Sequence, residues 1–400
     1  MGIFVYIYPC SFCQAALESG TPQNQPLNPM NLIVNPAQTL HVCLISCILF
    51  SLAQDTKAND GVFYARGNQM IPVAETDISV RKEILSLKKV RNQHIEVTVY
   101  YEFYNPGNAK TITVGFEAAS PSGDVEAAPR QGRHPFMRDF TVNMNKTLLP
   151  YEVAFVADSL YADKGKVKTM KLDTFKGATD GNHVDFFYVY HFQAPFKKGL
   201  NIIRHTYSYA LSGSVAYHYD FAYVLTAANR WANKQIDDFT LLIDPGEFET
   251  FNIEKTFFRD SSQWLIKGIG KVRELKGMGE TYFRPHALRF HVQKGILIFR
   301  QQNFKPEGEL EVFAENYGYF YDSTYLPFSY YQQDRIAEPA DAFRRKALRN
   351  LPFARRGYVF KDRQLDAFFR GMDWYIPNPG YRPDIKLLSE AEKQWIAKWK

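Results

Sequence analysis

The sequence predicts a mainly β protein: an antiparallel β-sandwich or jelly-roll-like body, followed by a small α-helical C-terminal module. Two observations support this prediction. Apolar and polar residues alternate with a period of two from about residue 80 to residue 315, and the apolar period becomes helical after Pro339. Aromatic residues make up 16% of the 400 residues, and such side chains favour strands over flexible tails.

The alternation is clearest from His94 to Tyr104, where apolar side chains occupy every second position before the turn residues Asn105, Pro106 and Gly107. The same pattern recurs at residues 183–192, 200–210, 239–243 and 288–299, and Gln293, Lys294 and Gly295 are expected to form a hairpin connection within the last of these. About a dozen short strands follow from this pattern. We therefore predict a β-sandwich body over residues 60–330.

The first 53 residues have the features of a leader. Residues 40–53, LHVCLISCILFSLA, form an apolar run of 14, whereas a bilayer-spanning helix needs about 20 apolar residues. Ser51 and Ala53 provide the small residues that cleavage after Ala53 requires. We expect a signal peptide over residues 30–53, a spurious extension over residues 1–29 and no transmembrane span in the mature chain. The absence of Lys and Arg before Lys57 departs from the usual signal-peptide pattern.

Cysteine content and charge narrow the class of protein. All four cysteines lie in this leader, at Cys10, Cys13, Cys43 and Cys47, and no second Cys/His pair lies near Cys10 and Cys13. We predict no metal and no cofactor. Residues 1–56 hold two acidic side chains and no basic one, so the remaining chain carries 48 basic and 40 acidic side chains, a net charge of +8. This balance favours acidic envelope polymers or lipid head groups as partners, and we expect no nucleic acid partner.

Candidate chemistry in the body is sparse. His183 with Asp185, and His218 with Asp220, each place an imidazole and a carboxylate at i and i+2 of a predicted strand, hence on one face. His205 is interpreted as a hydrogen-bonded core residue. Two unlinked pairs indicate no particular reaction, so we predict a protein that is not an enzyme.

An aromatic segment closes the body. Residues 317–331, YGYFYDSTYLPFSYY, contain eight aromatic side chains in fifteen. Tyr317, Tyr319, Tyr321 and Tyr325 could stack against sugar rings or a partner's side chains. The interpretation that we favour is that these rings seal the joint between the sandwich and the tail.

The tail is predicted to be helical. Phe343, Ala347, Leu351 and Ala354 form an apolar stripe, and Gly357 stands where a helix needs a left-handed residue to close its last turn. Arg355 and Arg356 would complement the negative end of the helix dipole. A second helix is expected to begin at Asp362, and Ser389 to Glu392 form a capping box that opens a third.

LRNLPFARRGYVFKDRQLDAFF, then WYIP, then LSEAEKQWI, in that order, resemble the YARHG domain of bacterial exported and cell-envelope proteins over about residues 335–400. Phe353 stands in place of the naming Tyr, and Arg356 in place of the naming His. Pro352 also departs from the pattern, because a proline within a helix costs about 3 kcal/mol unless the helix kinks. The resemblance implies an extracytoplasmic location, periplasmic or secreted, and no established catalytic activity.

Residues 335–400 carry 15 basic and 8 acidic side chains. We predict an exported, non-enzymatic cell-envelope protein, in which a β-sandwich scaffold carries a basic, aromatic module that binds an envelope polymer or a protein partner. The predicted binding residues are Arg355, Arg356, Tyr358, Arg363, Arg370, Trp374 and Tyr375, through charge-assisted hydrogen bonds and stacking.

Three other interpretations stay open at this point. The tail could be an ordinary solvated helical surface. The protein could be an envelope hydrolase that acts on glycans or peptides, with acid and base residues on strand ends of the body. It could also have a purely structural or assembly role.

Overall fold

The computed structural model describes residues 62–63, 69–74, 76–123, 125, 128–157, 162–163, 166–171, 186–275, 277, 284–316 and 325–400. The chain divides into residues 1–57 and 58–400, and every described residue belongs to the second unit. The expected leader, the four cysteines, His183, Asp185, Tyr317, Tyr319 and Tyr321 lie outside the described residues.

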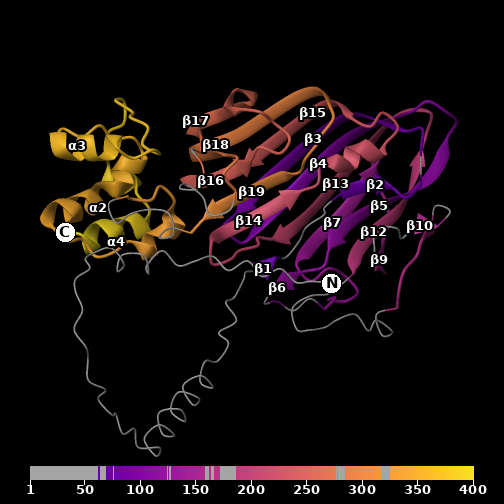
Figure 1. Ribbon diagram of the computed structural model, residues 1–400, viewed down its shortest axis with the longest axis horizontal. Helices are drawn as coiled ribbons and strands as arrows, with labels where there is room; N and C mark the ends of the chain where they lie inside the picture. The colour runs from indigo at the N-terminus through magenta and orange to yellow at the C-terminus, as the bar shows by residue number, and fades with distance from the viewer. Residues whose placement is uncertain are drawn as a thin grey trace, which may run out of the picture. The chain divides into compact units, whose positions relative to one another are not determined.

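The fold is mainly β, as the alternation predicts, and Figure 1 shows strands through most of the described chain. One sheet has four strands in the order β2-β5-β12-β9. Its strands are β2 (Gln69–Pro72), β5 (Lys110–Ala119), β12 (Phe187–Phe196) and β9 (Glu152–Val156). Two short ribbons pair β1 (Val62–Phe63) with β6 (Ser122–Gly123), and β10 (Ala162–Asp163) with β11 (Lys166–Val167).

The second sheet has eleven strands in the order β14-β19-β16-β18-β15-β3-β4-β13-β7-β8, with β17 paired to β18. Its strands are β3 (Ser79–Val90), β4 (His94–Asn105), β7 (Met137–Met144), β8 (Thr147–Leu148), β13 (Gly199–Ala210), β14 (Tyr217–Tyr223), β15 (Ile236–Asp244), β16 (Glu249–Glu254), β17 (Trp264–Glu274), β18 (Ala287–Phe304) and β19 (Leu310–Glu315). The described strand pairs are antiparallel except for β3 with β15, which run parallel.

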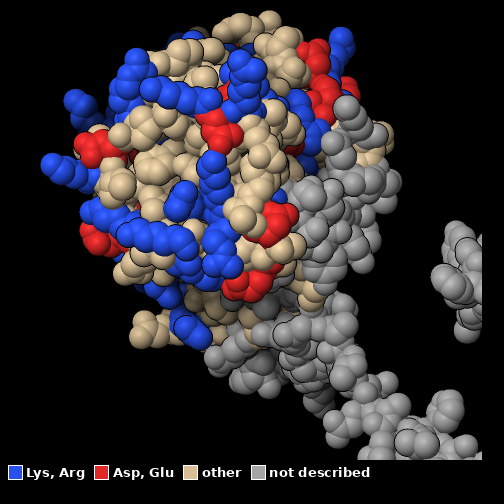
Figure 2. Space-filling view, turned by 90° about the vertical axis from the view of Figure 1, so that its left-hand side faces the viewer, with Lys and Arg blue, Asp and Glu red and all other residues tan. Residues whose placement is uncertain are grey.

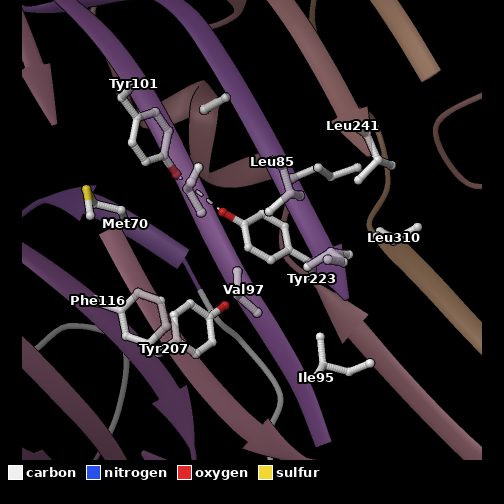
Figure 3. Packing of buried hydrophobic residues seen from close by; sticks show 14 of the residues in the cluster. Met70, Leu85, Ile95, Val97, Tyr101, Phe116, Tyr207, Tyr223, Leu241 and Leu310 are labelled. Carbon is white, nitrogen blue, oxygen red and sulfur yellow. Dashed lines mark hydrogen bonds between the residues drawn. The ribbon is translucent and has the colours of Figure 1, made fainter. Parts of the chain in front are cut away.

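The large sheet curls, and its inner face is covered partly by its own first strand and partly by the four-stranded sheet. β14 and β4 stand at the first and seventh places of the sheet order, yet the hydroxyls of Tyr223 and Tyr101 lie 3.3 Å apart. The four-stranded sheet covers another part of the same face, because Phe116 of β5 packs against Tyr207 of β13 at 4.9 Å between ring centroids. Figure 3 shows these rings together in the main core. The body is therefore an open sandwich.

One acidic side chain lies in this core. Glu83 is 5% exposed and shares the inner face of β3 with Leu85. Burial raises the pKa of its carboxyl to about 8, because the apolar surroundings favour the uncharged form. Burial also raises the pKa of Tyr101, Tyr207 and Tyr223, and the nearby Glu83 adds to this rise in each case.

The expected hairpin at Gln293, Lys294 and Gly295 is wrong, because these residues lie inside β18, a single strand of 18 residues. Gly295 (φ +122°) faces Gly268 (φ +153°) of β17. A Cβ on Gly268 would lie 2.1 Å from the carbonyl oxygen of Lys294. The glycines thus allow two strands to bend together where β18 passes from pairing with β16 to pairing with β15.

The C-terminal part is helical, as predicted. It contains α2 (Ala342–Arg355), α3 (Arg363–Arg370) and α4 (Glu390–Lys398), which lie together in Figure 1. Short 3₁₀ turns are η2 (Thr226–Arg230), η3 (Ser261–Gln263), η4 (Tyr330–Arg335) and η5 (Ile385–Leu387). None of the helices in the described ranges is long and apolar enough to span a membrane.

The helices have an apolar core that also includes residues from the body. Leu348, Leu351 and Phe369 belong to a cluster that includes Phe248, which lies just before β16, and Phe328. We refer to residues 325–400 as the helical segment. The division into a body over 60–330 and a module over 335–400 stays a prediction, since residues 58–400 form one compact unit.

Candidate binding surface of the helical segment

The C-terminal end of α2 is closed by a glycine. Gly357 has a φ of +80°, and the amide of Tyr358 donates to the carbonyl of Phe353 at 3.0 Å, while the amide of Gly357 donates to Ala354 at 2.8 Å. This pair of bonds is a Schellman motif. A Cβ on Gly357 would also lie 2.2 Å from the carbonyl oxygen of Ile376. The sequence-based expectation for Gly357 is confirmed.

The first arginine of the ARRG sequence is buried. Arg355 is 2% exposed, and its guanidinium donates to the carbonyl oxygens of Pro327 at 2.8 Å and Ser329 at 3.4 Å. The guanidinium carbon also lies 4.4 Å from the ring centroid of Tyr330. Burial lowers the pKa of Arg355 to about 10. Arg355 thus connects the end of α2 to the segment that enters the helices.

The second arginine joins two helices. Arg356 forms a bidentate pair with Glu392 of α4, at 2.5 Å for Nη1 to Oε1 and 3.1 Å for Nη2 to Oε2. The hydroxyl of Tyr330 donates to the same carboxylate at 2.5 Å. Burial raises the pKa of Glu392, but these hydrogen bonds more than offset it, so the pKa is lowered overall.

Pro352 is accommodated within α2 by a contact from α4. A proline at this position leaves the carbonyl of Leu348 without its helical donor. The indole Nε1 of Trp395 donates to that carbonyl at 2.7 Å. The expected cost of Pro352 is therefore offset by an interhelical hydrogen bond.

The aromatic pair after α3 faces inward. Trp374 is 1% exposed and its Nε1 donates to the carbonyl of Leu326 at 2.6 Å. Tyr375 is 5% exposed and its hydroxyl donates to the carbonyl of Tyr358 at 2.6 Å. The polar tips of both rings are used to fix backbone segments within the fold.

Asp373 connects the helical segment to the sheet. Its Oδ2 accepts from Nε and Nη2 of Arg273 on β17, at 3.1 Å and 2.9 Å, and its Oδ1 accepts from the hydroxyl of Tyr325 at 2.7 Å. Nε2 of the fully buried His291 on β18 lies 3.4 Å from Oδ2. Burial raises the pKa of Asp373, but contacts with His291, Tyr325 and Arg273 bring it well below its ordinary value.

Further contacts extend this junction. Nδ1 of His291 lies 2.9 Å from Oγ1 of Thr250 on β16, and the amide of Thr250 donates to Oγ of Ser329 at 2.8 Å. Nζ of Lys271 on β17 donates to the carbonyl of Tyr375 at 3.1 Å. The helical segment is thus attached to β16, β17 and β18 by named polar contacts.

Several Lys and Arg side chains lie on α2 and around the start of α3. Lys346 on α2 pairs with Asp362, which caps the N-terminus of α3. Arg345 and Arg349 lie on α2 beside Lys346, and Lys361 and Arg363 flank Asp362 in sequence. We call the four residues Arg345, Arg349, Lys361 and Arg363 the basic face. Within the described ranges, none of the four forms an ion pair, and all except the half-buried Arg349 are exposed. Figure 2, which faces the end with α2, α3 and α4, shows more Lys and Arg than Asp and Glu.

The comparison with protein families matches this segment. Residues 329–400 match the YARHG domain. Residues 329–400 of the helical segment form a YARHG domain. Its N-terminal boundary at Ser329 lies six residues before the boundary expected from the sequence. YARHG domains are typical of exported proteins.

Comparisons with whole proteins give weaker likenesses. No curated protein matches the chain. A crystal structure of a candidate nutrient-binding protein from Legionella pneumophila is 19% identical, covers 86% of this chain and 100% of its own, and gives a TM-score of 0.43. An M1 zinc metallopeptidase from Deinococcus radiodurans is 11% identical over 60% of this chain, with a TM-score of 0.25, and 43% of its own length is covered.

The YARHG domain distributes the seven predicted binding residues between its interior and its surface. Arg355, Trp374 and Tyr375 are buried and hold the fold together, so a ligand at the surface does not reach them. Arg356 and Tyr358 are half-buried. Arg363 and Arg370 are exposed, and Arg370 pairs with Asp366 at 2.6 Å. Binding by the four exposed or half-buried members stays a prediction, and Arg363 is the member on the basic face.

The predicted imidazole–carboxylate pair in the described part of the body is not assembled as a site. The ring of His218 stacks on Tyr331 with centroids 3.8 Å apart, whereas Asp220 pairs with Arg284 at 3.3 Å, and a bulge interrupts β14 beside His218. His205 is buried as expected, and burial lowers its pKa to about 4. Among the described residues, no group of three His, Cys, Asp or Glu side chains could hold a metal ion.

Sequence reasoning missed the junction and most of the basic face. Arg345 and Arg349 stand four residues apart on a predicted helix, so their shared side could have been read from the sequence. Asp373 and His291 are 82 positions apart in a chain without internal repeats, and no local pattern relates them. The favoured interpretation of Tyr325 as a seal agrees with its bond to Asp373.

Proposed function

We propose that this protein is exported and acts as a non-enzymatic binding protein of the cell envelope, in which the basic face of the YARHG domain holds an anionic envelope polymer. The β body serves as the scaffold. A protein partner with an acidic surface is the second ligand class that the same chemistry would accept.

The basic face is the observation that supports this proposal. Arg345, Arg349, Lys361 and Arg363 carry four cations without ion-pair partners in the described ranges, and the carboxylate of Asp362, between Lys361 and Arg363 in the sequence, already pairs with Lys346. Cations without carboxylate partners on their own surface remain available to phosphate or carboxylate groups of a ligand. A flexible polymer with repeated charges would contact several of them at once, so weak individual contacts would add up.

The extracytoplasmic location is supported by the family and by the sequence of residues 40–53. Cell fractionation with an intact-mass measurement tests it. A mature chain that begins after Ala53 is expected outside the cytoplasm, and a full-length cytoplasmic chain would contradict export.

We also propose that the protein is not an enzyme, although three of its side chains resemble a catalytic series. Thr250, His291 and Asp373 form a chain of contacts in the order of a nucleophile, a base and an acid. Thr250 is 7% exposed and His291 is 0% exposed, so a substrate has no access to them. Their contacts are explained by the junction between the sheet and the YARHG domain.

Retention on purified cell-wall material tests the binding role. The Arg345→Glu, Arg349→Glu double variant reverses two charges of the basic face without touching the buried contacts. We expect its retention to fall by about tenfold or more, since it loses two attractions and gains two repulsions.

A matched control comes from the body. Lys267 of β17 and Lys294 of β18 are both exposed, and the Lys267→Glu, Lys294→Glu variant changes the net charge by the same amount. Its retention should stay near that of the unmodified protein. Equal loss in both double variants would indicate a general charge effect and contradict the proposed site.

A further inference from the structure

A turn between α3 and α4 exposes two large apolar side chains. Ile385 and Leu387 of η5 are 56% and 76% exposed, and Leu387 is the most exposed large apolar side chain among the described residues. Isolated exposed apolar residues are common on protein surfaces. Here two lie in a single 3₁₀ turn, on either side of Lys386, and we call this pair the apolar tip.

The turn is held in this position by ordered contacts. The carboxylate of Asp384 accepts from the amide of Lys386 at 2.8 Å, and the amide of Leu388 donates to the carbonyl of Ile385 at 3.2 Å. Leu388 is 4% exposed and anchors the end of the turn in the domain. The exposure of Ile385 and Leu387 is thus built into the fold.

The residues before the turn are also held by backbone hydrogen bonds. The amide of Asn378 donates to the carbonyl of Gly357 at 2.8 Å, and the amide of Tyr381 donates to Asn378 at 3.0 Å. Residues 378–388 are consequently fixed to the end of α2 on one side and to the start of α4 on the other. Such a segment can place its tip without losing much conformational freedom on binding.

Two cationic side chains lie close to the apolar tip in the sequence. Lys386 lies between the two apolar residues, and Arg382 lies three residues before Ile385. Both are exposed, and neither forms an ion pair in the part of the chain that the structure describes. Asp384, the nearest acidic residue in sequence, is occupied as the cap of the turn.

We propose that this turn docks the protein on a lipid bilayer with anionic head groups, with Ile385 and Leu387 in the interface and Lys386 and Arg382 at the head-group level. A bilayer supplies an apolar layer and negative charge at adjacent depths, which this arrangement of side chains requires. A second copy of the chain fits poorly, because residues 335–400 carry 15 basic and 8 acidic side chains and would repel their own kind.

This role goes beyond polymer binding and uses other residues, so the two proposals can fail separately. Co-sedimentation of the purified full chain with vesicles tests it, with phosphatidylglycerol and phosphatidylethanolamine in one set and phosphatidylcholine alone in the other. We expect binding to the first set. The Ile385→Ser, Leu387→Ser variant should bind the anionic vesicles about tenfold less, since each apolar side chain loses its transfer free energy.

Two controls define the result. Leu148 and Leu265, which are 66% and 59% exposed on the body, provide a Leu148→Ser, Leu265→Ser variant of similar chemistry that should bind like the unmodified protein. A Leu387→Trp variant should show a blue shift of its fluorescence with anionic vesicles, because the new ring enters a less polar layer.

Several outcomes would overturn the proposal. One is the absence of vesicle binding by the unmodified protein; another is equal binding by the Ile385→Ser, Leu387→Ser variant and the unmodified chain. Loss of vesicle binding in the Arg345→Glu, Arg349→Glu variant alone would assign it to the basic face. A concentration-dependent dimer that the turn variant abolishes would identify a second copy as the occupant.

Discussion

The indole Nε1 of Trp395 donates a 2.7 Å hydrogen bond to the carbonyl of Leu348, the carbonyl that Pro352 leaves without a donor inside α2. This contact explains how the YARHG domain keeps a proline within its first helix. It also makes α4 part of the support of α2, although α4 begins 35 residues after α2 ends. The two helices should therefore lose stability together.

Trp395→Phe removes the donor and leaves a buried carbonyl unpaired. We expect the free energy of unfolding to fall by about 1–3 kcal/mol, the usual range for an unsatisfied buried polar group. Urea denaturation measures it. Trp399→Phe is the matched control, because the indole nitrogen of Trp399 is buried without a hydrogen-bond partner in the described structure. An equal loss in both variants would contradict the role of the bond.

Arg356→Ala leaves the carboxylate of Glu392 buried without its bidentate partner. We expect a loss of about 3 kcal/mol in the free energy of unfolding, the lower end of the range for breaking a buried pair. Arg370→Ala removes an exposed pair with Asp366 and should have little effect. The same small effect for both variants would show that Glu392 finds other partners when Arg356 is absent.

Glu83→Gln should change how stability depends on pH. The folded pKa of Glu83 is raised to about 8 by burial, above its ordinary value of 4.5, so the folded chain holds this proton where the unfolded chain releases it. The contribution of the Glu83 proton to the free energy of unfolding is complete below about pH 4.5. Above this pH the contribution falls by about 1.4 kcal/mol per pH unit, until the pH passes the folded pKa of about 8. The difference in unfolding free energy between Glu83→Gln and the unmodified protein should grow over this window. A constant difference would place the carboxyl in a more polar environment.

Asp373→Asn keeps the shape of the side chain but removes the charge that Arg273 and Tyr325 hold. We expect a loss of about 2 kcal/mol, because hydrogen bonds to a charged group are stronger than neutral ones. Hydrogen exchange should rise on both sides of the junction, in β17 and around Trp374. Faster exchange confined to the helices would indicate that the domain is not coupled to the sheet.

The elements that depend on local pattern could be predicted from the sequence. The alternation of Ile95, Val97 and Val99 predicts β4, and Gly357 predicts the end of α2, because both depend on residues close in the chain. The burial of Arg355 could not be predicted in this way. Its partners Pro327 and Ser329 lie outside the helix, and an arginine at a helix C-terminus equally well fits an exposed position that complements the dipole.

Two further features could not be predicted for the same reason. Gln293, Lys294 and Gly295 are residue types that are common in turns. Gly295 instead pairs with Gly268 of another strand, and this pairing, which the sequence does not show, explains why both glycines are needed for a bend. Glu83 interrupts an apolar face and gives no local sign that tyrosines from β4, β13 and β14 lie near enough for its carboxyl to raise their pKa. Tertiary contacts decide these positions, whereas local periodicity decides the strands and helices.

The dissociation constant for anionic polymer released from purified cell walls, measured at increasing ionic strength, tests the central claim most directly. The basic face predicts that affinity falls as salt rises, and that Arg345→Glu with Arg349→Glu weakens binding by about tenfold or more at low salt. The Lys267→Glu, Lys294→Glu control should retain the affinity of the unmodified protein. Binding that is indifferent to salt and to the charges at Arg345 and Arg349 would contradict the account.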